Sequence, residues 1–277
     1  MKKIIAVVLT LVLMLCCCTA MADKLEDIKA SGKLLVGAEV AFAPYEFYFT
    51  DPETGVEELA GFEMSLAKGL ADELGVELVV ADQAFSGLIT GLRVGEMDCI
   101  ISGMAIKPDR EEVVDFSTPY YTGKQVVLVR EEDFDTYKTP EDFTGKKIGA
   151  QLGSLQQGCA EEQFANAGEL MLLDKVPLLM FELQLGNIDG VLVTDIVGKS
   201  YMSVYPGLTI SECPVVFSSS GVAVAVNKGE ENASFLQFIN DYIAKVTESG
   251  EFEQWFQTAM EQNGQLLAAE AAAEAAE

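Results

Sequence analysis

Short apolar runs and helical periodicities alternate along residues 33–103. Apolar residues recur every four positions from Phe62 to Leu74, which is the spacing of one helix face, and Phe85–Val94 has a similar spacing. Between these segments, short apolar runs predict strands at Lys33–Gly37, Val76–Val80 and Cys99–Gly103. Strands that alternate with helices need crossover connections, so we expect a mostly parallel sheet flanked by helices.

The same alternation begins again at residue 147. Strands are predicted at Lys147–Ala150, Glu169–Leu173 and Gly190–Val193. Two further apolar runs, Gln125–Val129 and Gly221–Val226, are placed to carry the chain from one half to the other and back. We therefore expect an α/β protein of two lobes joined by two crossing strands. Lobe one would comprise residues 23–122 and 221–277, and lobe two residues 123–220.

The last residues, 264–277, are mostly alanine and glutamate. This composition favours a helix but offers little apolar bulk, so we expect a frayed acidic helix that does not dock firmly.

The first 22 residues are typical of an export signal. Two lysines precede an almost unbroken apolar run over residues 4–18, which is too short for a comfortable membrane span, and Ala-Met-Ala follows at residues 20–22. We expect cleavage before Asp23 and a soluble mature protein in the periplasm or at the outer face of the cytoplasmic membrane. Lipid attachment at Cys18 is the alternative. We favour ordinary cleavage because Cys17, rather than a small residue, precedes Cys18.

Composition and charge exclude several functions. The chain has 18 basic and 44 acidic side chains, for a net charge of −26, which disfavours nucleic-acid binding. It has no histidine, so Ser-His-Asp and Cys-His catalysis and His-ligated metal sites are excluded, and we expect no cofactor or metal. Beyond the signal only Cys99, Cys159 and Cys213 remain. One cystine is possible in principle, and three buried thiols are the interpretation that we favour.

Seven segments, in order and at family spacing, resemble the polar amino-acid-binding proteins of ABC importers (extracellular solute-binding protein family 3). They are Gly37–Phe47, Gly61–Glu63, Phe85–Ile89, Ile101–Arg110, Val114–Tyr121, Gln151–Ser154 and Gly250–Trp255. The resemblance implies the two-lobed type II periplasmic-binding-protein fold. It also implies an extracytoplasmic monomer that captures an amino acid or a similar small zwitterion in the interlobe cleft, closes on it and delivers it to a membrane permease.

Two of these segments suit a carboxylate. Arg110 can offer a planar guanidinium that pairs with a carboxylate through two hydrogen bonds, and the Gly153–Ser154 turn opens a helix whose free N–H groups suit an anion. Taken alone, Arg110 would be a solvated surface residue and Ser154 a plain helix cap.

The resemblance implies further ligand contacts, residue by residue. Phe42 and Phe85 match two aromatic residues that enclose the ligand side chain, and Glu39 matches an acidic residue at the end of the first strand, which would meet an ammonium group. The remaining matches supply hydroxyl, amide or backbone contacts, and they are Ser102, Gly103, Gln151, Leu155 and Gln156.

Two positions depart from the family pattern. Ala105 stands where the family usually has a threonine, and Thr194 stands where it places an ammonium-binding aspartate, with Asp195 one residue later. Either the register slips by one and Asp195 serves, or Glu39 and neutral oxygens hold the ammonium. Both departures leave room for a small carboxylate other than a plain α-amino acid.

The alternative function is an enzyme on the same fold, because some relatives resemble dehydratases of cyclic acids. Such chemistry needs a poised acid in the pocket, and Glu39 is the best-placed candidate. Nothing in the sequence singles Glu39 out as catalytic, so we predict a binding protein without catalysis.

Overall fold

A computed structural model describes residues 23–52, 54–217 and 219–274. The predicted export signal, including Cys18, lies outside these residues. Among the helices of the described ranges, none combines the length and the apolar character that a membrane span requires.

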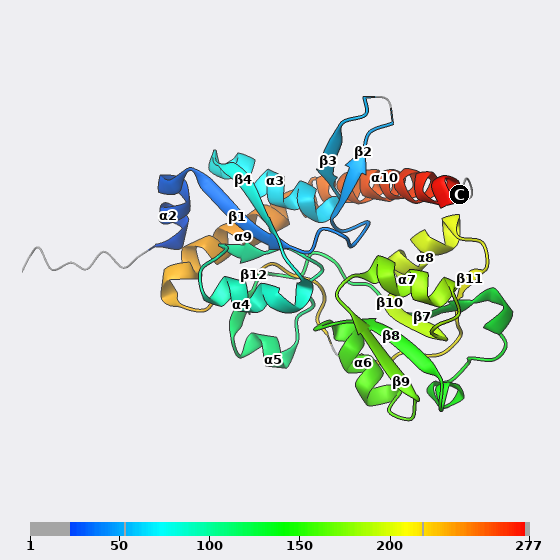
Figure 1. The fold of residues 1–277 in the computed structure, drawn as a ribbon. Helices are drawn as coiled ribbons and strands as arrows, with labels where there is room; N and C mark the ends of the chain where they lie inside the picture. Colours follow the sequence, from blue (N-terminus) through cyan, green and yellow to red (C-terminus); the bar gives the residue numbers. More distant parts are fainter. Residues whose placement is uncertain (1–22, 53, 218, 275–277) are drawn as a thin grey trace, which may run out of the picture.

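Lobe one is built on a five-stranded sheet in the order β4-β1-β5-β12-β6 (Figure 1). Strands β4, β1 and β5 are parallel, and β12 runs antiparallel to both β5 and β6. The strands are β1 (Lys33–Ala38), β4 (Glu77–Asp82), β5 (Cys99–Ile100), β6 (Val114–Phe116) and β12 (Ala225–Asn227). The helices of this lobe are α2 (Lys24–Ser31), α3 (Phe62–Leu74), α4 (Leu88–Arg93), α5 (Pro108–Glu111) and α9 (Ala233–Glu248).

Lobe two repeats this plan with the order β11-β7-β10-β8-β9. Strands β10, β8 and β9 are parallel, and β7 is antiparallel to its neighbours β10 and β11. The elements are β7 (Gln125–Arg130), β8 (Lys147–Gln151), α6 (Leu155–Gln163), β9 (Glu169–Leu173), α7 (Val176–Gln184), β10 (Gly190–Thr194), α8 (Asp195–Val204) and β11 (Leu208–Ile210). Short 3-10 helices lie at Phe85–Gly87, Glu131–Asp133, Pro140–Phe143 and Glu230–Asn232. The predicted mixed α/β class is confirmed.

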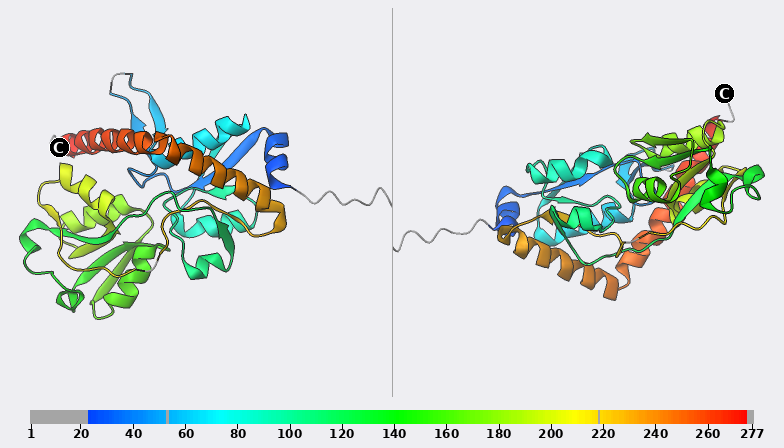
Figure 2. Two further views of the ribbon diagram at one scale, coloured as in Figure 1. Left: turned by 180° about the vertical axis from the view of Figure 1, so that it is seen from behind. Right: turned by 90° about the horizontal axis from the view of Figure 1, so that it is seen from below.

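Two chain segments cross between the lobes side by side (Figure 2). They pair at Tyr121 and Val222, where the Val222 N–H donates to the Tyr121 carbonyl at 2.8 Å and the Tyr120 N–H donates to the Val222 carbonyl at 3.0 Å. A hairpin of β2 (Phe47–Thr50) and β3 (Glu57–Ala60) projects from lobe one (Figure 1). Because so few residues join the lobes, these segments are the natural hinge.

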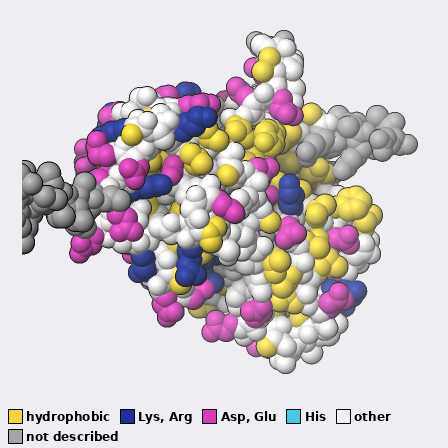
Figure 3. Space-filling model, turned by 60° about the vertical axis from the view of Figure 1, so that its left-hand side comes forward, with side chains coloured by type: hydrophobic (Ala, Val, Ile, Leu, Met, Phe, Trp, Pro, Cys, Tyr) yellow, Lys and Arg dark blue, Asp and Glu magenta, His cyan; other side chains and the backbone are white. Residues whose placement is uncertain are grey.

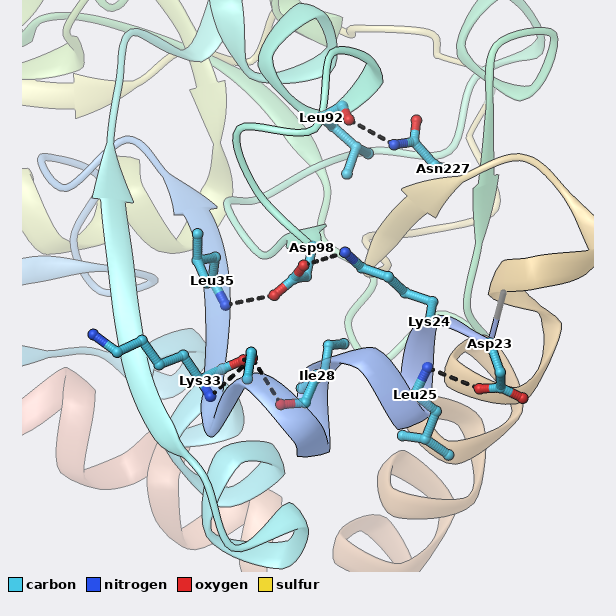
Figure 4. Close-up of polar contacts among 10 residues, drawn as sticks. Asp23, Lys24, Leu25, Ile28, Lys33, Leu35, Leu92, Asp98 and Asn227 are labelled. Atoms are coloured by element: carbon cyan, nitrogen blue, oxygen red, sulfur yellow. Dashed lines mark hydrogen bonds and ion pairs between the residues drawn. The ribbon is translucent and has the colours of Figure 1, made fainter. Parts of the chain in front are cut away.

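The start of the described chain is tied to the lobe-one sheet (Figure 4). Asp23 caps α2 by accepting the N–H groups of Leu25 and Glu26. The Asp98 carboxylate accepts the Leu35 N–H at 2.8 Å and pairs with Lys24. These contacts join the first turn of α2 to β1 and to the loop before β5.

The prediction that the tail does not dock was wrong. Helix α10 runs over Glu251–Glu274; Leu266 packs against Phe47 and Phe49 of the hairpin, and Leu267 is 3 % exposed. The surface that receives these residues is assembled from distant parts of the chain, so the tail's own composition could not reveal it.

The three cysteines of the described chain, Cys99, Cys159 and Cys213, are buried and free, as predicted. Acidic side chains are scattered over the face of the molecule shown in Figure 3, in keeping with the net charge of −26.

Two glutamates are completely buried in lobe one beside the crossing segments. Glu63 accepts the Gly103 N–H at 2.8 Å and the Tyr120 hydroxyl at 2.6 Å, whereas Glu46 accepts only the Ser102 hydroxyl, at 2.6 Å. Burial is the main cause that raises the pKa of both carboxyls, and the charge of Glu63 raises the pKa of Glu46 further. Glu63 accepts more hydrogen bonds than Glu46 does, so the negative charge is better stabilised on Glu63 and Glu46 holds the proton.

We expect Glu46→Gln to stabilise the protein at alkaline pH. Below the ordinary carboxyl pKa of 4.5, folded and unfolded chains both hold this proton. Above it the unfolded chain releases the proton first, so the free energy of unfolding falls by about 1.4 kcal/mol per pH unit until the raised folded pKa is reached. Glutamine keeps both hydrogen bonds without ionising, so urea unfolding from pH 5 to 8.5 should show a flatter profile for the variant.

Glu63→Gln is the matched control, because its amide nitrogen would oppose the Gly103 N–H. This variant should lose stability at every pH. If Glu46→Gln has the same pH slope as the parent protein, Glu46 does not hold the proton.

Candidate functional site

A cavity of about 30 Å³ lies between the lobes, at the ends of the sheet strands. A water molecule needs about 10–15 Å³, so an amino acid can enter only after the lobes part and side chains move. The cavity is lined by Phe42, Tyr45, Phe85, Gly103, Ala105, Arg110, Gln125, Gln151, Ser154, Leu155, Gln156, Thr194 and Val222.

Most residues singled out from the sequence line this cavity. They are Phe42, Phe85, Gly103, Ala105, Arg110, Gln151, Ser154, Leu155, Gln156 and Thr194. Glu39, Ser102 and Asp195 do not line it. Three lining residues were not singled out: Tyr45 lies within the segment Gly37–Phe47, and Gln125 and Val222 lie on the runs predicted to cross between lobes, so the crossing itself was the available signal.

Arg110 is the central polar group of the cavity. It follows a Pro-Asp pair in the single turn α5, and its side chain is only 5 % exposed. Its guanidinium donates to the Ala105 carbonyl at 2.7 Å and, across the cleft, to the Gly153 carbonyl at 2.9 Å. Burial lowers the pKa of Arg110 to about 10, which leaves it charged at neutral pH. No carboxylate of the described residues lies within 4.0 Å of this cation.

The N-terminus of α6 faces Arg110 from lobe two. Ser154 caps the helix through its hydroxyl, which accepts the Gln157 N–H at 3.1 Å, and the Gln157 side chain accepts the Gly153 N–H at 2.7 Å. The N–H groups of Leu155 and Gln156 have no partner within the helix, because they belong to its first turn. A cation and a helix N-terminus on opposite walls form a site suited to an anion.

The two walls touch in this structure, so the cleft is closed. Gly153 has φ +77°, and a Cβ added there would lie 3.0 Å from the Cα of Ser86 in lobe one. The Gln151 amide also crosses the cleft and donates to Glu39 at 3.1 Å. An L side chain at position 153 would therefore be strained and would also press on the opposite lobe.

Glu39 lies behind Gln151 rather than in the cavity wall. It is 1 % exposed, one of its oxygens accepts from Gln151, and the other has no partner among the described residues. Burial raises the pKa of Glu39 to about 7, against the lowering effects of Gln151 and Lys175. A ligand group that displaced the Gln151 amide would reach a buried carboxyl poised between its two protonation states.

Thr194, and not Asp195, reaches the cavity. Asp195 accepts the Lys124 N–H at 3.2 Å and pairs with Lys199 at 2.8 Å, so it turns away toward the crossing segment. The hydroxyls of Thr194 and Tyr45 neighbour each other, and neither bonds any other described group. The register of β10 therefore places neutral oxygens where the family pattern has a carboxylate.

The Ser102 hydroxyl and the Gly103 N–H form hydrogen bonds within lobe one. The Ser102 hydroxyl accepts the Glu39 N–H at 2.9 Å and donates to Glu46, while the Gly103 N–H donates to Glu63. Ser102 therefore positions the end of β1 and does not face the cavity.

The two phenylalanines line the cavity and make different contacts. Phe42 stacks on Tyr45 with ring centroids 4.6 Å apart. Phe85 lies under the guanidinium of Arg110, 5.4 Å from ring centroid to Cζ, which gives the buried cation a favourable cation–π contact.

Known proteins resemble this chain over most of its length. The family model of bacterial extracellular solute-binding proteins, family 3, matches residues 34–262. ABC transporter arginine-binding protein 1 of Escherichia coli (strain K12) is 30 % identical over 82 % of this chain and 92 % of the relative. The L-cystine-binding protein TcyJ of the same strain is 31 % identical over 84 % of this chain and 85 % of the relative.

A crystal structure of the amino acid ABC transporter substrate-binding protein AbpA from Streptococcus pneumoniae, bound to L-arginine, superposes with a TM-score of 0.81 at 33 % identity. It covers 86 % of this chain and 98 % of that protein, and so supports the type II periplasmic-binding-protein fold for both lobes. The chain belongs to the bacterial extracellular solute-binding proteins, family 3.

Proposed function

We propose that this protein is the substrate-binding protein of an ABC importer and that its ligand is a cationic α-amino acid, with L-arginine the first candidate. The observation that carries the proposal is the buried guanidinium of Arg110, which lacks a carboxylate partner among the described residues and faces a helix N-terminus across the cleft.

The ligand carboxylate would occupy the space between these two groups. Arg110 uses two of its N–H groups on carbonyl oxygens, and charge-assisted pairing with a carboxylate is stronger than pairing with a neutral carbonyl. A ligand carboxylate would thus replace the Gly153 carbonyl as a partner and would also receive the first N–H groups of α6.

A cationic side chain is supported by Glu39. Its unpaired oxygen is buried, and its other oxygen accepts from the amide of Gln151, a residue that lines the cavity. A guanidinium that displaced this amide would pair with the ionised carboxylate. Relatives named for arginine agree with this choice, although TcyJ is named for cystine.

Neutral oxygens would hold the α-ammonium group. Thr194 and Tyr45 present hydroxyls that bond no other described group, and a primary ammonium is a donor only. This assignment replaces the aspartate of the family pattern.

Export and delivery complete the proposal. The residues 1–22 would direct the chain out of the cytoplasm, with cleavage before Asp23 in preference to acylation at Cys18. The closed, ligand-bound monomer would then dock on the membrane permease of its importer. We do not propose the dehydratase, because the relatives named above are binding proteins.

We expect Arg110→Ala to weaken L-arginine binding by about 2–5 kcal/mol, because the ligand carboxylate would be buried without a charged partner. Isothermal titration calorimetry measures this loss. Arg93→Ala, which changes an exposed arginine of the same lobe, is the matched control and should bind as the parent protein does. Equal affinities of the two variants would contradict the assignment of Arg110.

We expect Gly153→Ala to have two effects. It should strain the backbone, and it should also hinder closure of the cleft. Gly153 and Gly186 have nearly equal φ angles, +77° and +75°, but a Cβ at Gly186 meets nothing within 4 Å. Both variants should therefore lose about 1–2 kcal/mol of stability, whereas only Gly153→Ala should lose affinity for L-arginine. Calorimetry with both variants tests this, and equal affinity losses would refute the contact with Ser86.

We expect L-arginine affinity to rise with pH between pH 6 and 8. The pKa of Glu39 is about 7 in the closed structure without ligand, and a cationic ligand binds its ionised form, so affinity rises by up to about tenfold per pH unit below pH 7. The chain has no histidine to complicate this range. Calorimetry should find a flat profile for Glu39→Gln; parallel profiles would remove Glu39 from the site.

A further inference from the structure

We propose that the C-terminal part of α10, Ala259–Leu267, is an interlobe strap that stabilises the closed orientation of the two lobes. The strap adds a third connection to the two crossing segments. It acts on the open–closed equilibrium itself and does not depend on which ligand the cleft binds.

The first turns of α10 are fixed to lobe one. Phe252 and Trp255 pack against the lobe-one core, and the Phe252 ring lies 5.8 Å from that of Phe62. Phe256 then stacks on Tyr121 of the crossing segment, with centroids 5.8 Å apart and planes 20° apart. Helix α10 therefore moves with lobe one and lies directly against the hinge.

The following turns reach lobe two. Ala259 is 1 % exposed and belongs to the same apolar cluster as Ile196 and Val197 of α8. In the two views of Figures 1 and 2, α10 runs from lobe one to the side of lobe two that carries α8, and the two helices are in contact.

The end of the strap closes a seam between the lobes. Asn263 and Leu267 are 1 % and 3 % exposed, and with Leu266 they line a cavity of about 190 Å³. The other lining residues come from lobe one (Val40, Ala41, Ala43, Phe47 and Tyr48) and from lobe two (Pro177 and Tyr201). One helix face therefore contacts both lobes at once, on a seam separate from the ligand cavity.

This arrangement favours closure for a simple reason. Rotation of lobe two about the crossing segments near Tyr121 and Val222 would carry α8 and Pro177 away from a helix that stays with lobe one. The apolar surface of Ala259 and Leu267 would then return to water, at a cost of about 25 cal/mol per Å². The Asn263 carboxamide oxygen reduces this stabilisation of the closed state, because it is buried there without a partner among the described residues.

The last part of the strap lies beyond the region that the family model matches. The family model ends at residue 262, whereas α10 continues to Glu274. Asn263, Leu266 and Leu267 all fall in this extension.

Spin-label distance measurements on the ligand-free protein test the proposal. Labels at Glu112→Cys in lobe one and Glu161→Cys in lobe two lie on exposed positions, and the three native cysteines of the described chain are buried. Leu267→Ala should shift the distances toward longer values, whereas Gln265→Ala, an exposed change in the same helix, should leave them unchanged. Identical distributions for these two variants, both folded by circular dichroism, would overturn the strap.

A second variant covers the case in which Leu267→Ala fails to fold. Asn263→Leu removes the unpaired carboxamide oxygen and adds apolar surface, so its closed fraction should equal or exceed that of the parent protein; a smaller closed fraction would overturn the proposal. If L-arginine is the ligand, Leu267→Ala should also bind it about tenfold more weakly, or 1.4 kcal/mol. Failure of L-arginine to bind at all would contradict the proposed ligand. The distance measurements on the ligand-free protein would still test the strap.

Discussion

The burial of Arg110 is the constraint on which the site depends. A buried cation is costly unless hydrogen bonds and an opposite charge compensate it. Here two carbonyl oxygens, those of Ala105 and Gly153, and the ring of Phe85 provide the compensation, and the carbonyls come from opposite lobes. The same guanidinium thus holds the closed cleft together and lacks the anionic partner that would satisfy it fully, so an anion that enters the cleft gains more from the closed state than from the open one.

Closure and recognition are therefore one process. Moving a protein from about 1 % to 99 % closed requires about 5.5 kcal/mol of differential affinity. In the proposed complex the ligand replaces the interlobe contacts of Arg110 with Gly153 and of Gln151 with Glu39, so its own contacts reach both walls only when the lobes are closed. The strap of α10 would contribute on a second seam, where Ala259 and Leu267 bury apolar surface between the lobes, so that the ligand need not supply the whole free energy of closure.

The sequence predicted what depends on local pattern. Apolar runs located most strands of both sheets, though not the edge strands β6 and β11, and the segment Ile101–Arg110 led to the arginine that reaches the cavity. The sequence alone could not predict features that depend on strand register or on residues distant in the chain. A one-residue difference in β10 selects Thr194 instead of Asp195, and the surface that receives Leu267 is built from both lobes. The shared proton of Glu46 and Glu63 was equally hidden, because their separation in sequence says nothing of their common burial.

A crystal structure of the protein grown with L-arginine is the most direct test of this account. The account predicts density for the ligand in the interlobe cleft, with its carboxylate within hydrogen-bond distance of both the Arg110 guanidinium and the first N–H groups of α6. Its side chain should approach Glu39. Arginine bound elsewhere, or bound in the cleft with its carboxylate away from Arg110, would contradict the central role of the buried guanidinium.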